Sequence, residues 1–403
     1  MATLDFQAFD ADNHYYEALD AFTRHIEPQY AKRAMQWAEV NGKTRLLVGG
    51  RINRFIPNPT FDPVSKPGAL DEYFRGRNPN SQGVRDLFGE LDPISPVYRN
   101  RDARLAKMDE QGLGGAFFFP TLGVGMEQSL IGDPPALMAA FRAFNRWLEE
   151  DWGFAYQERI FAAPYIPLVD VDNAVAELEW AIDHDVRIII TGVGPVVTAA
   201  GGHAPSHTKY DPFWSRVNEA GITVALHGGD SAYSRYIEAW GESAEMEAFR
   251  ASPLRGLLSH DPMHDTVAAM LADQFFIRFP NIRVASIELG STWASHLFEK
   301  LGKVYGQGPA AFPEDPRDTF RRHVWVSPYY EDDLAALKDL IGVDRILMGS
   351  DWPHAEGLAD PVSYIEDLRR FGYTDDEARL VMADNGWALA RTNVLAPSAG
   401  SGR

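Results

Sequence analysis

Hydrophobic residues along the chain fall into short, almost wholly apolar runs that alternate with longer amphipathic stretches. Uniformly apolar runs of this length are typical of strands that are buried on both faces of a parallel sheet. Eight such runs occur, at residues 6–12, 115–120, 160–167, 186–191, 222–227, 282–288, 323–327 and 345–350.

Stretches of helical periodicity separate most of these runs. We expect helices at 101–111, 135–156, 171–184, 211–220, 262–279, 292–302, 331–341 and 375–394, and residues 34–37 also have helical spacing. Eight strands alternating with helices predict a (β/α)8 barrel. An open doubly wound sheet is disfavoured, because no glycine-rich phosphate loop follows the first strand.

One region, at about 42–100, breaks this alternation. Proline and glycine recur throughout it, and it is too long for a plain loop. We interpret it as an irregular insertion after strand 1, either a lid over one end of the barrel or an exposed flap without a role. Residues 1–395 then form a single domain, and the small, polar tail at 396–403 is expected to be disordered.

Composition narrows the possible partners. The chain has 403 residues, a formal net charge of −19 and no cysteine. The negative charge argues against nucleic acid and anionic membranes as partners, and the lack of cysteine excludes disulfides and thiolate metal ligands. The sequence contains no signal-peptide pattern and no apolar run of about 18 residues. We therefore predict a cytoplasmic enzyme that acts on a small molecule.

Polar residues with metal-binding chemistry follow several of the predicted strands. Asp12 and His14 are two residues apart, so their side chains share one face of a strand. His227, Glu288 and Asp351 follow strands five, six and eight. In a barrel these strand ends meet, and catalytic groups come from them.

Imidazole and carboxylate groups suit one divalent ion, which we predict to be zinc, with manganese or iron(II) as alternatives. The predicted catalytic residues are Asp351, which would exchange the proton of an activated water, and His227. Taken singly, His227 could be a core histidine, Glu288 could pair with a buried arginine and Asp351 could cap a turn. Their joint occurrence at strand ends favours the metal site.

Four motifs resemble the amidohydrolase-related family, in the branch that includes aminocarboxymuconate semialdehyde decarboxylase. They are Phe-Asp-Ala-Asp-Asn-His-Tyr-Tyr-Glu, Val-Ala-Leu-His-Gly-Gly, Ile-Glu-Leu-Gly-Ser-Thr-Trp and, the most specific, Met-Gly-Ser-Asp-Trp-Pro-His. The similarity spans about 6–394 except for the insertion. It implies a distorted (β/α)8 barrel, a homodimer and a single metal ion, with His14, His227 and Asp351 at ligand positions.

Two positions depart from the family pattern. Asp12 stands where the family commonly has the first histidine of a His-x-His pair, and Glu288 stands where its decarboxylases often have a histidine. These departures make the site more acidic and favour hydrolysis of a carbonyl compound. Non-oxidative decarboxylation of a small aromatic or unsaturated acid, and a non-catalytic barrel with a decayed metal site, are the alternatives.

Further residues are candidates for substrate contact. His354 and Glu356 follow Asp351 on one loop and could contact substrate or form loop hydrogen bonds. Trp293 could face the mouth of the barrel or pack in the core, and Arg51 and Arg54 of the insertion could hold a carboxylate. The pairs His203 and His207, and His260 and His264, are not expected to bind metal.

Overall fold

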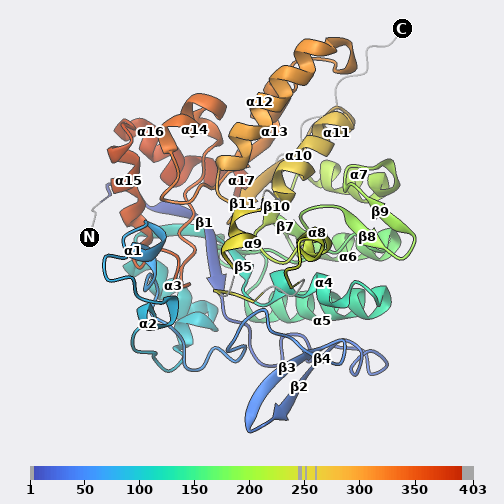
Figure 1. Cartoon of the computed structure of the whole chain (residues 1–403), viewed down its shortest axis with the longest axis vertical. Helices are drawn as coiled ribbons and strands as arrows, with labels where there is room; N and C mark the ends of the chain where they lie inside the picture. The colour runs from blue at the N-terminus through green and yellow to red at the C-terminus, as the bar shows by residue number, and fades with distance from the viewer. Residues whose placement is uncertain (1–3, 244–246, 250–251, 259–260, 393–403) are drawn as a thin grey trace.

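The computed structural model describes residues 4–243, 247–249, 252–258 and 261–392; the predicted tail at 396–403 lies outside them. Two parallel sheets form its centre (Figure 1). One has the order β1-β5-β6, and the other has the order β12-β11-β10-β7. Their strands are β1 (Ala8–Tyr15), β5 (Leu113–Pro120), β6 (Ile160–Ala162), β7 (Ile188–Thr191), β10 (Thr223–His227), β11 (Arg283–Ile287) and β12 (Val324–Val326).

Two irregular segments join these sheets into a closed circuit. On one side, Ile166 N donates to Ile190 O over 2.9 Å, directly after β6. On the other side, Leu347 N donates to Val326 O over 2.9 Å, and Ala11 N donates to Met348 O over 2.8 Å. The segment at 346–352 therefore connects β12 to β1.

Two of the eight predicted strands are thus less regular than expected. The third is regular only over Ile160–Ala162, because Pro164 and Pro167 have no N–H to donate to a ladder. In the eighth, the 3₁₀ turn Val343–Arg345 comes first, and single bridges at Ile346 and Trp352 follow. The remaining predicted strands are present.

Helices surround the strands (Figure 1). Those foreseen from the sequence are α3 (Arg101–Glu110), α5 (Pro134–Asp151), α6 (Val171–Asp183), α7 (Asp211–Ala220), α10 (Pro262–Ala272), α11 (Phe275–Arg278), α12 (Thr292–Gln307), α14 (Leu334–Ile341), α16 (Asp375–Arg379) and α17 (Asn385–Ala390). The single helix predicted at 262–279 is divided into α10 and α11 by Gln274, whose φ is 52°, and the one predicted at 375–394 is divided into α16 and α17 by the π-helical turn Leu380–Asp384. The structure adds α4 (Glu127–Leu130), α8 (Ser234–Ala239), α9 (Pro253–Leu257), α13 (Pro316–His323) and α15 (Tyr364–Arg370). Of the helices described, none has the length and apolar character needed to cross a membrane.

The helical spacing at 34–37 was misleading, because this stretch is a strand. β2 (Met35–Val40) and β3 (Lys43–Val48) form an antiparallel hairpin, which β4 (Arg51–Ile52) extends. The two-residue turn is Asn41-Gly42, with φ values of 52° and 69°. Asn-Gly with two positive φ angles is the preferred two-residue hairpin turn, so the sequence did contain the signal for this strand pair.

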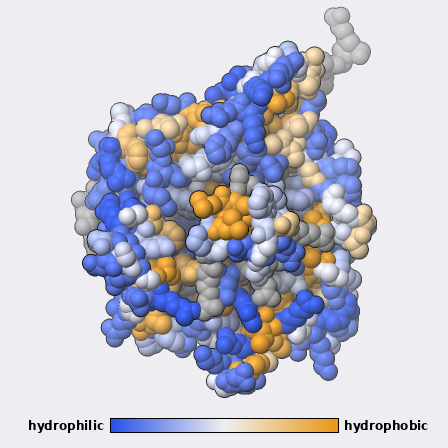
Figure 2. Space-filling view, in the orientation of Figure 1, coloured by the Kyte–Doolittle hydropathy of each residue, from blue (hydrophilic) through white to orange (hydrophobic). Residues whose placement is uncertain are grey.

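The rest of the insertion packs back onto the strand-end loops. It contains only short helices, α1 (Asp71–Phe74) and α2 (Val84–Leu87). Leu70 N donates to Ala355 O over 2.7 Å, and Ala248 N donates to Phe55 O over 2.9 Å. The insertion is thus attached to the loop after Asp351 and to the segment that precedes α9. On α9 itself, Leu254 and Leu257 are 40% and 82% exposed, and apolar side chains gather there on the surface (Figure 2).

Candidate metal centre and active site

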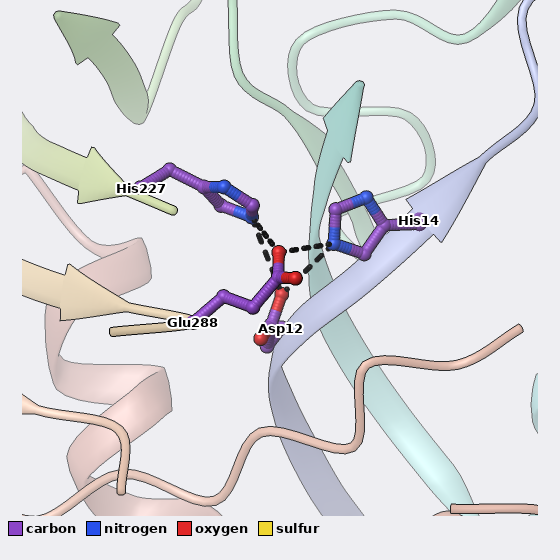
Figure 3. A group of neighbouring side chains, drawn as sticks. All are labelled: Asp12, His14, His227 and Glu288. Atoms are coloured by element: carbon purple, nitrogen blue, oxygen red, sulfur yellow. Dashed lines mark ion pairs between the residues drawn. The ribbon is translucent and has the colours of Figure 1, made fainter. Parts of the chain in front are cut away.

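Four of the predicted ligands converge at the carboxyl ends of β1, β10 and β11 (Figure 3). Each of Asp12, His14, His227 and Glu288 offers one donor atom, and these atoms all lie within 4.8 Å of one another. His14 Nε2 is 3.2 Å from Asp12 Oδ1, and His227 Nε2 is 3.4 Å from Glu288 Oε2. His227 Nε2 is 3.5 Å from Asp12 Oδ1, and His14 Nε2 is 3.7 Å from Glu288 Oε2.

These separations fit a metal ion. Donors about 2.1 Å from a tetrahedral ion lie roughly 3.4 Å apart. Asp12 Oδ1, His14 Nε2 and His227 Nε2 are buried and have no hydrogen-bond partner, although unpaired buried polar atoms are costly. Their contacts are short but lack hydrogen-bond geometry, because the atoms face a common point. The residues therefore fit a divalent ion.

The orientation of His227 also suits ligation. Its Nδ1 is 2.7 Å from Gly228 O, and a carbonyl oxygen only accepts hydrogen bonds. Nδ1 therefore carries the proton in the neutral ring, which leaves the lone pair of Nε2 directed into the cluster.

Glu288 and Asp351 share an uncommon backbone conformation. Their φ angles are 53° and 55°, in the left-handed region that non-glycine residues seldom adopt. Such conformations cost free energy and concentrate at functional sites. In both residues, the backbone turns immediately after a strand or extended segment and directs a carboxylate into the cluster.

Asp351 lies at the edge of this group. Its Oδ1 is 3.4 Å from His14 Nε2 and 2.5 Å from His354 Nδ1. Thr121 Oγ1 donates to Tyr15 O over 2.9 Å and is 2.9 Å from His354 Nε2. Because the hydroxyl proton is used on Tyr15, His354 Nε2 must donate to Thr121, and a single proton then lies between Asp351 and His354.

Burial and close charged neighbours shift the pKa values of the clustered side chains. Burial and the nearby Asp351 carboxylate raise the pKa of Glu288 well above its usual value. Burial, Glu356 and Asp12 likewise raise the pKa of Asp351. Burial opposes ionisation of Asp12, but His14 and His227 outweigh it and lower the pKa of that carboxyl group. Burial and His354 lower the pKa of His14 to about 3, so its ring is neutral and available as a ligand.

Two buried residues that the sequence analysis missed hold this arrangement. The Asp10 carboxylate accepts hydrogen bonds from Ser350 N over 2.9 Å and Ser350 Oγ over 2.5 Å, which ties β1 to the turn at Asp351. Arg104, fully buried, donates to His14 O over 2.8 Å. A charged residue on the apolar face of the predicted helix at 101–111 was the available signal for Arg104.

A cavity of about 510 Å³ opens beside the cluster, and His14, Glu288, His354 and Glu356 line it. Much of its remaining wall comes from the insertion. A second cavity of about 220 Å³ reaches Asp12, Glu288, Asp351 and Glu356 from another direction. Glu288 and Glu356 line both cavities, so these two carboxyl groups lie where the cavities meet.

Two predicted substrate contacts lie elsewhere. Trp293 is 1% exposed on α12, where its indole donates to Gly290 O over 3.0 Å, so the packing alternative holds. Arg51 is exposed in β4, and neither it nor Arg54 lines the cavity. The strand β4 directs Arg51 to solvent, whereas the sequence predicted an irregular insertion over about residues 42–100.

The other histidines also lie apart from the cluster. The rings of His203 and His207 lie against each other in a tilted arrangement with centroids 4.4 Å apart, and both residues are exposed. His264 Nδ1 is 2.7 Å from Asp265 Oδ1 on α10, and His260 lies outside the described residues. None of the described three belongs to a group of potential metal ligands.

A circuit of parallel strands with clustered histidine and carboxylate donors at the strand ends defines a class of enzymes that use a metal ion. Comparison with known proteins supplies the family. Residues 92–389 match the family model described as Amidohydrolase. The chain therefore belongs to the amidohydrolase family and is an enzyme of hydrolase or carboxy-lyase type.

Solved structures agree with this assignment. An amidohydrolase from Mycobacterium avium subsp. paratuberculosis K-10 is 41% identical, with a TM-score of 0.90 over 96% of this chain and 100% of that one. The 5-carboxyvanillate decarboxylase of Sphingomonas paucimobilis is 14% identical, with a TM-score of 0.59 over 96% and 100%.

A dihydroxybenzoic acid decarboxylase from Polaromonas sp. JS666, with bound manganese and the inhibitor 2-nitroresorcinol, is 17% identical, with a TM-score of 0.56 over 80% and 93%. The two decarboxylases share the fold. No curated protein matches the sequence.

Proposed function

We propose that this chain is a metal-dependent hydrolase of carbonyl compounds, built on a (β/α)8 barrel with the insertion after strand 1. The observation that carries the proposal is the set of buried, unpartnered donor atoms on Asp12, His14 and His227, with Glu288 beside them. These four residues would hold the ion, which we propose to be zinc. When bound, the ion would supply Lewis-acid activation of water and of the substrate carbonyl.

Asp351 is the proposed acid and base. Its carboxylate borders the ligand cluster, 3.4 Å from His14 Nε2, so it can take a proton from attacking water and return it to the leaving group. His354, hydrogen-bonded to Asp351 and to Thr121, fixes the direction of that carboxylate and shares its proton. His227 would hold the ion through Nε2 and is not required to move a proton itself.

Non-oxidative decarboxylation is the second candidate. It is favoured by the fold shared with two decarboxylases, one of which holds manganese. The same residues would serve it, with Asp351 delivering a proton to the carbon that loses carbon dioxide.

One experiment separates the two. Protein purified without chelators and loaded with Zn²⁺ or Mn²⁺ is incubated with aryl esters and lactones, and in parallel with aromatic carboxylic acids. We expect release of the alcohol or ring-opened acid from the first group. If the acids release carbon dioxide and the esters and lactones stay intact, the proposed function becomes decarboxylation. If neither group of compounds is turned over, the remaining candidate is a non-catalytic barrel.

A further inference from the structure

The 510 Å³ cavity is continuous with the reactive residues. His14, Glu288 and His354 form part of its lining, so a molecule that fills it has one end at the proposed metal site. Its volume lies within the range of about 300–1,000 Å³ that holds drug-sized ligands. This is more space than the small substrate expected from the sequence would occupy.

The wall away from those residues is apolar and comes largely from the insertion. Its apolar members include Phe55, Phe61, Val64, Phe88, Leu91 and Phe249. Phe61 stacks on Tyr16 with ring centroids 4.5 Å apart, and the Tyr16 ring is 5.9 Å from that of His354. Aromatic surface thus extends continuously from His354 to the insertion.

Phe249 joins this wall from outside the insertion. It packs edge-to-face on Phe88, with ring centroids 5.1 Å apart, next to the backbone hydrogen bond between Ala248 and Phe55. Two segments far apart in the sequence therefore complete one apolar enclosure.

Charge in the cavity is one-sided. Among the described lining residues, Arg85 is the single arginine or lysine, and its side chain is exposed. Glu288 and Glu356 line the same cavity, and Asp12 and Asp351 lie just beyond them in the smaller one. No buried arginine or lysine of the described lining is therefore placed to pair with a carboxylate on a bound molecule, and burying an unpaired anion is costly.

We infer that this cavity binds the apolar portion of a bulky, uncharged ester or lactone, and discriminates against carboxylate-bearing molecules of the same shape. The inference rests on the proposed hydrolase function, which it deepens by naming the substrate class. The apolar wall provides binding through buried area, and the lack of a buried arginine or lysine in the described lining provides the discrimination.

A matched pair of ligands tests it by isothermal titration calorimetry. 2-Acetonaphthone and 2-naphthoate have nearly the same shape, and only the second carries a charge. We expect the zinc-loaded full chain to bind the ketone at least about tenfold more tightly, because burying an uncompensated anion is costly. Equal or tighter binding of naphthoate, or no binding of either below about 1 mM, overturns the inference.

Introducing a positive charge into the apolar wall tests whether the ligands bind in this cavity. Phe88→Lys should reduce the preference for the ketone at least about tenfold, because it places a cation in the lining. Tyr73→Lys is the control, since Tyr73 is a 37% exposed aromatic residue of the insertion that does not line the cavity. Leu91→Lys, at a 45% exposed lining residue, serves as a second variant if Phe88→Lys does not fold. An unchanged preference in a folded lining variant overturns the inference.

A kinetic comparison of two esters distinguishes failure of this inference from failure of the proposed hydrolase function. 2-Naphthyl butyrate and 2-naphthyl hemisuccinate differ by one carboxylate at the end of the acyl chain. We expect kcat/KM to be at least about tenfold higher for the butyrate. Hydrolysis that prefers the hemisuccinate contradicts the inference alone, whereas hydrolysis of neither ester contradicts the proposed function and leaves the binding preference to decide the inference.

Discussion

The ligand cluster and the wall of the large cavity are built in different ways. Asp12, His14, His227 and Glu288 sit on or directly after regular parallel strands, whose ladders fix each backbone. The wall comes from an irregular segment with a few short helices, held by scattered backbone hydrogen bonds. Strand ends hold donor atoms at fixed separations, whereas irregular segments can change their lining without disturbing the strands. Under the proposed function, reaction chemistry and substrate selection belong to separate parts of the chain.

Loss of a cluster ligand should have the largest effect. His227→Ala removes one of the four converging donors, so we expect metal content after dialysis to fall from about one ion per chain to below about 0.1. Elemental analysis measures this. His264→Ala is the matched control, because His264 is also buried but belongs to no group of potential ligands. Full metal retention by the His227 variant would place the ion elsewhere.

Substitution of the proposed acid and base should abolish most turnover while the ion is retained. Asp351→Asn removes the carboxylate that faces His354, and we expect kcat to fall about 10²- to 10⁴-fold. Steady-state kinetics on protein with verified metal content measure the change. Asp360→Asn makes the same chemical change on a nearby residue outside the cluster. A variant at 351 that keeps most of its rate would remove Asp351 from proton transfer.

The buried Glu17 should make the stability of the protein depend on pH. It follows β1 and accepts hydrogen bonds from Leu122 N and Gly123 N over 2.8 and 3.0 Å. Burial raises its pKa to about 7. Between about pH 4.5 and 7 the folded state keeps a proton that the unfolded chain releases, so this contribution to the free energy of unfolding falls as pH rises, by roughly 3 kcal/mol at most.

Glu17→Gln should remove this dependence, because an amide oxygen can still accept both hydrogen bonds. Urea unfolding at pH 5 and pH 8 gives the difference between wild type and variant at each pH. Relative to the variant, the wild type should be more stable at pH 5 than at pH 8. Glu72→Gln changes an exposed glutamate of the insertion and serves as the control: its stability should change between pH 5 and pH 8 as much as that of the wild type. If the stability of Glu17→Gln changed with pH in the same way as that of the wild type, the raised pKa of Glu17 would be contradicted.

The smallest effect is expected from the wall. Phe88→Ala removes one aromatic ring from the lining and its contact with Phe249, which corresponds to about 1 kcal/mol. For an apolar aryl ester we expect a three- to tenfold higher KM at nearly constant kcat. Tyr73→Ala, outside the cavity, should change neither. A fall in kcat by the same factor as the rise in KM would show that the wall also orients the reacting group. Substrate binding and reaction chemistry would then not be separated between the two regions.

How far the sequence predicted this molecule varies from segment to segment. The strands that end at His227 and before Glu288 were predicted because their burial on both faces makes them apolar throughout. Residues 34–37 were interpreted as helical because the spacing of Ala34, Met35 and Trp37 outweighed the Asn41-Gly42 turn signal, and the structure has the strand Met35–Val40 instead. The predicted eighth strand became an extended segment with single bridges, since its pairing depends on contacts with both β12 and β1.

The amino-acid sequence by itself determined which side chains follow the strands, because apolar periodicity and the residues that interrupt it are local properties. Only the tertiary structure decided that Asp12, His14, His227 and Glu288 face one point while Asp351 pairs with His354, and that Trp293 packs in the core. It also decided that the insertion and Phe249 enclose one cavity. These outcomes depend on distances between segments far apart in the chain, which the closed circuit of strands fixes and no local pattern records.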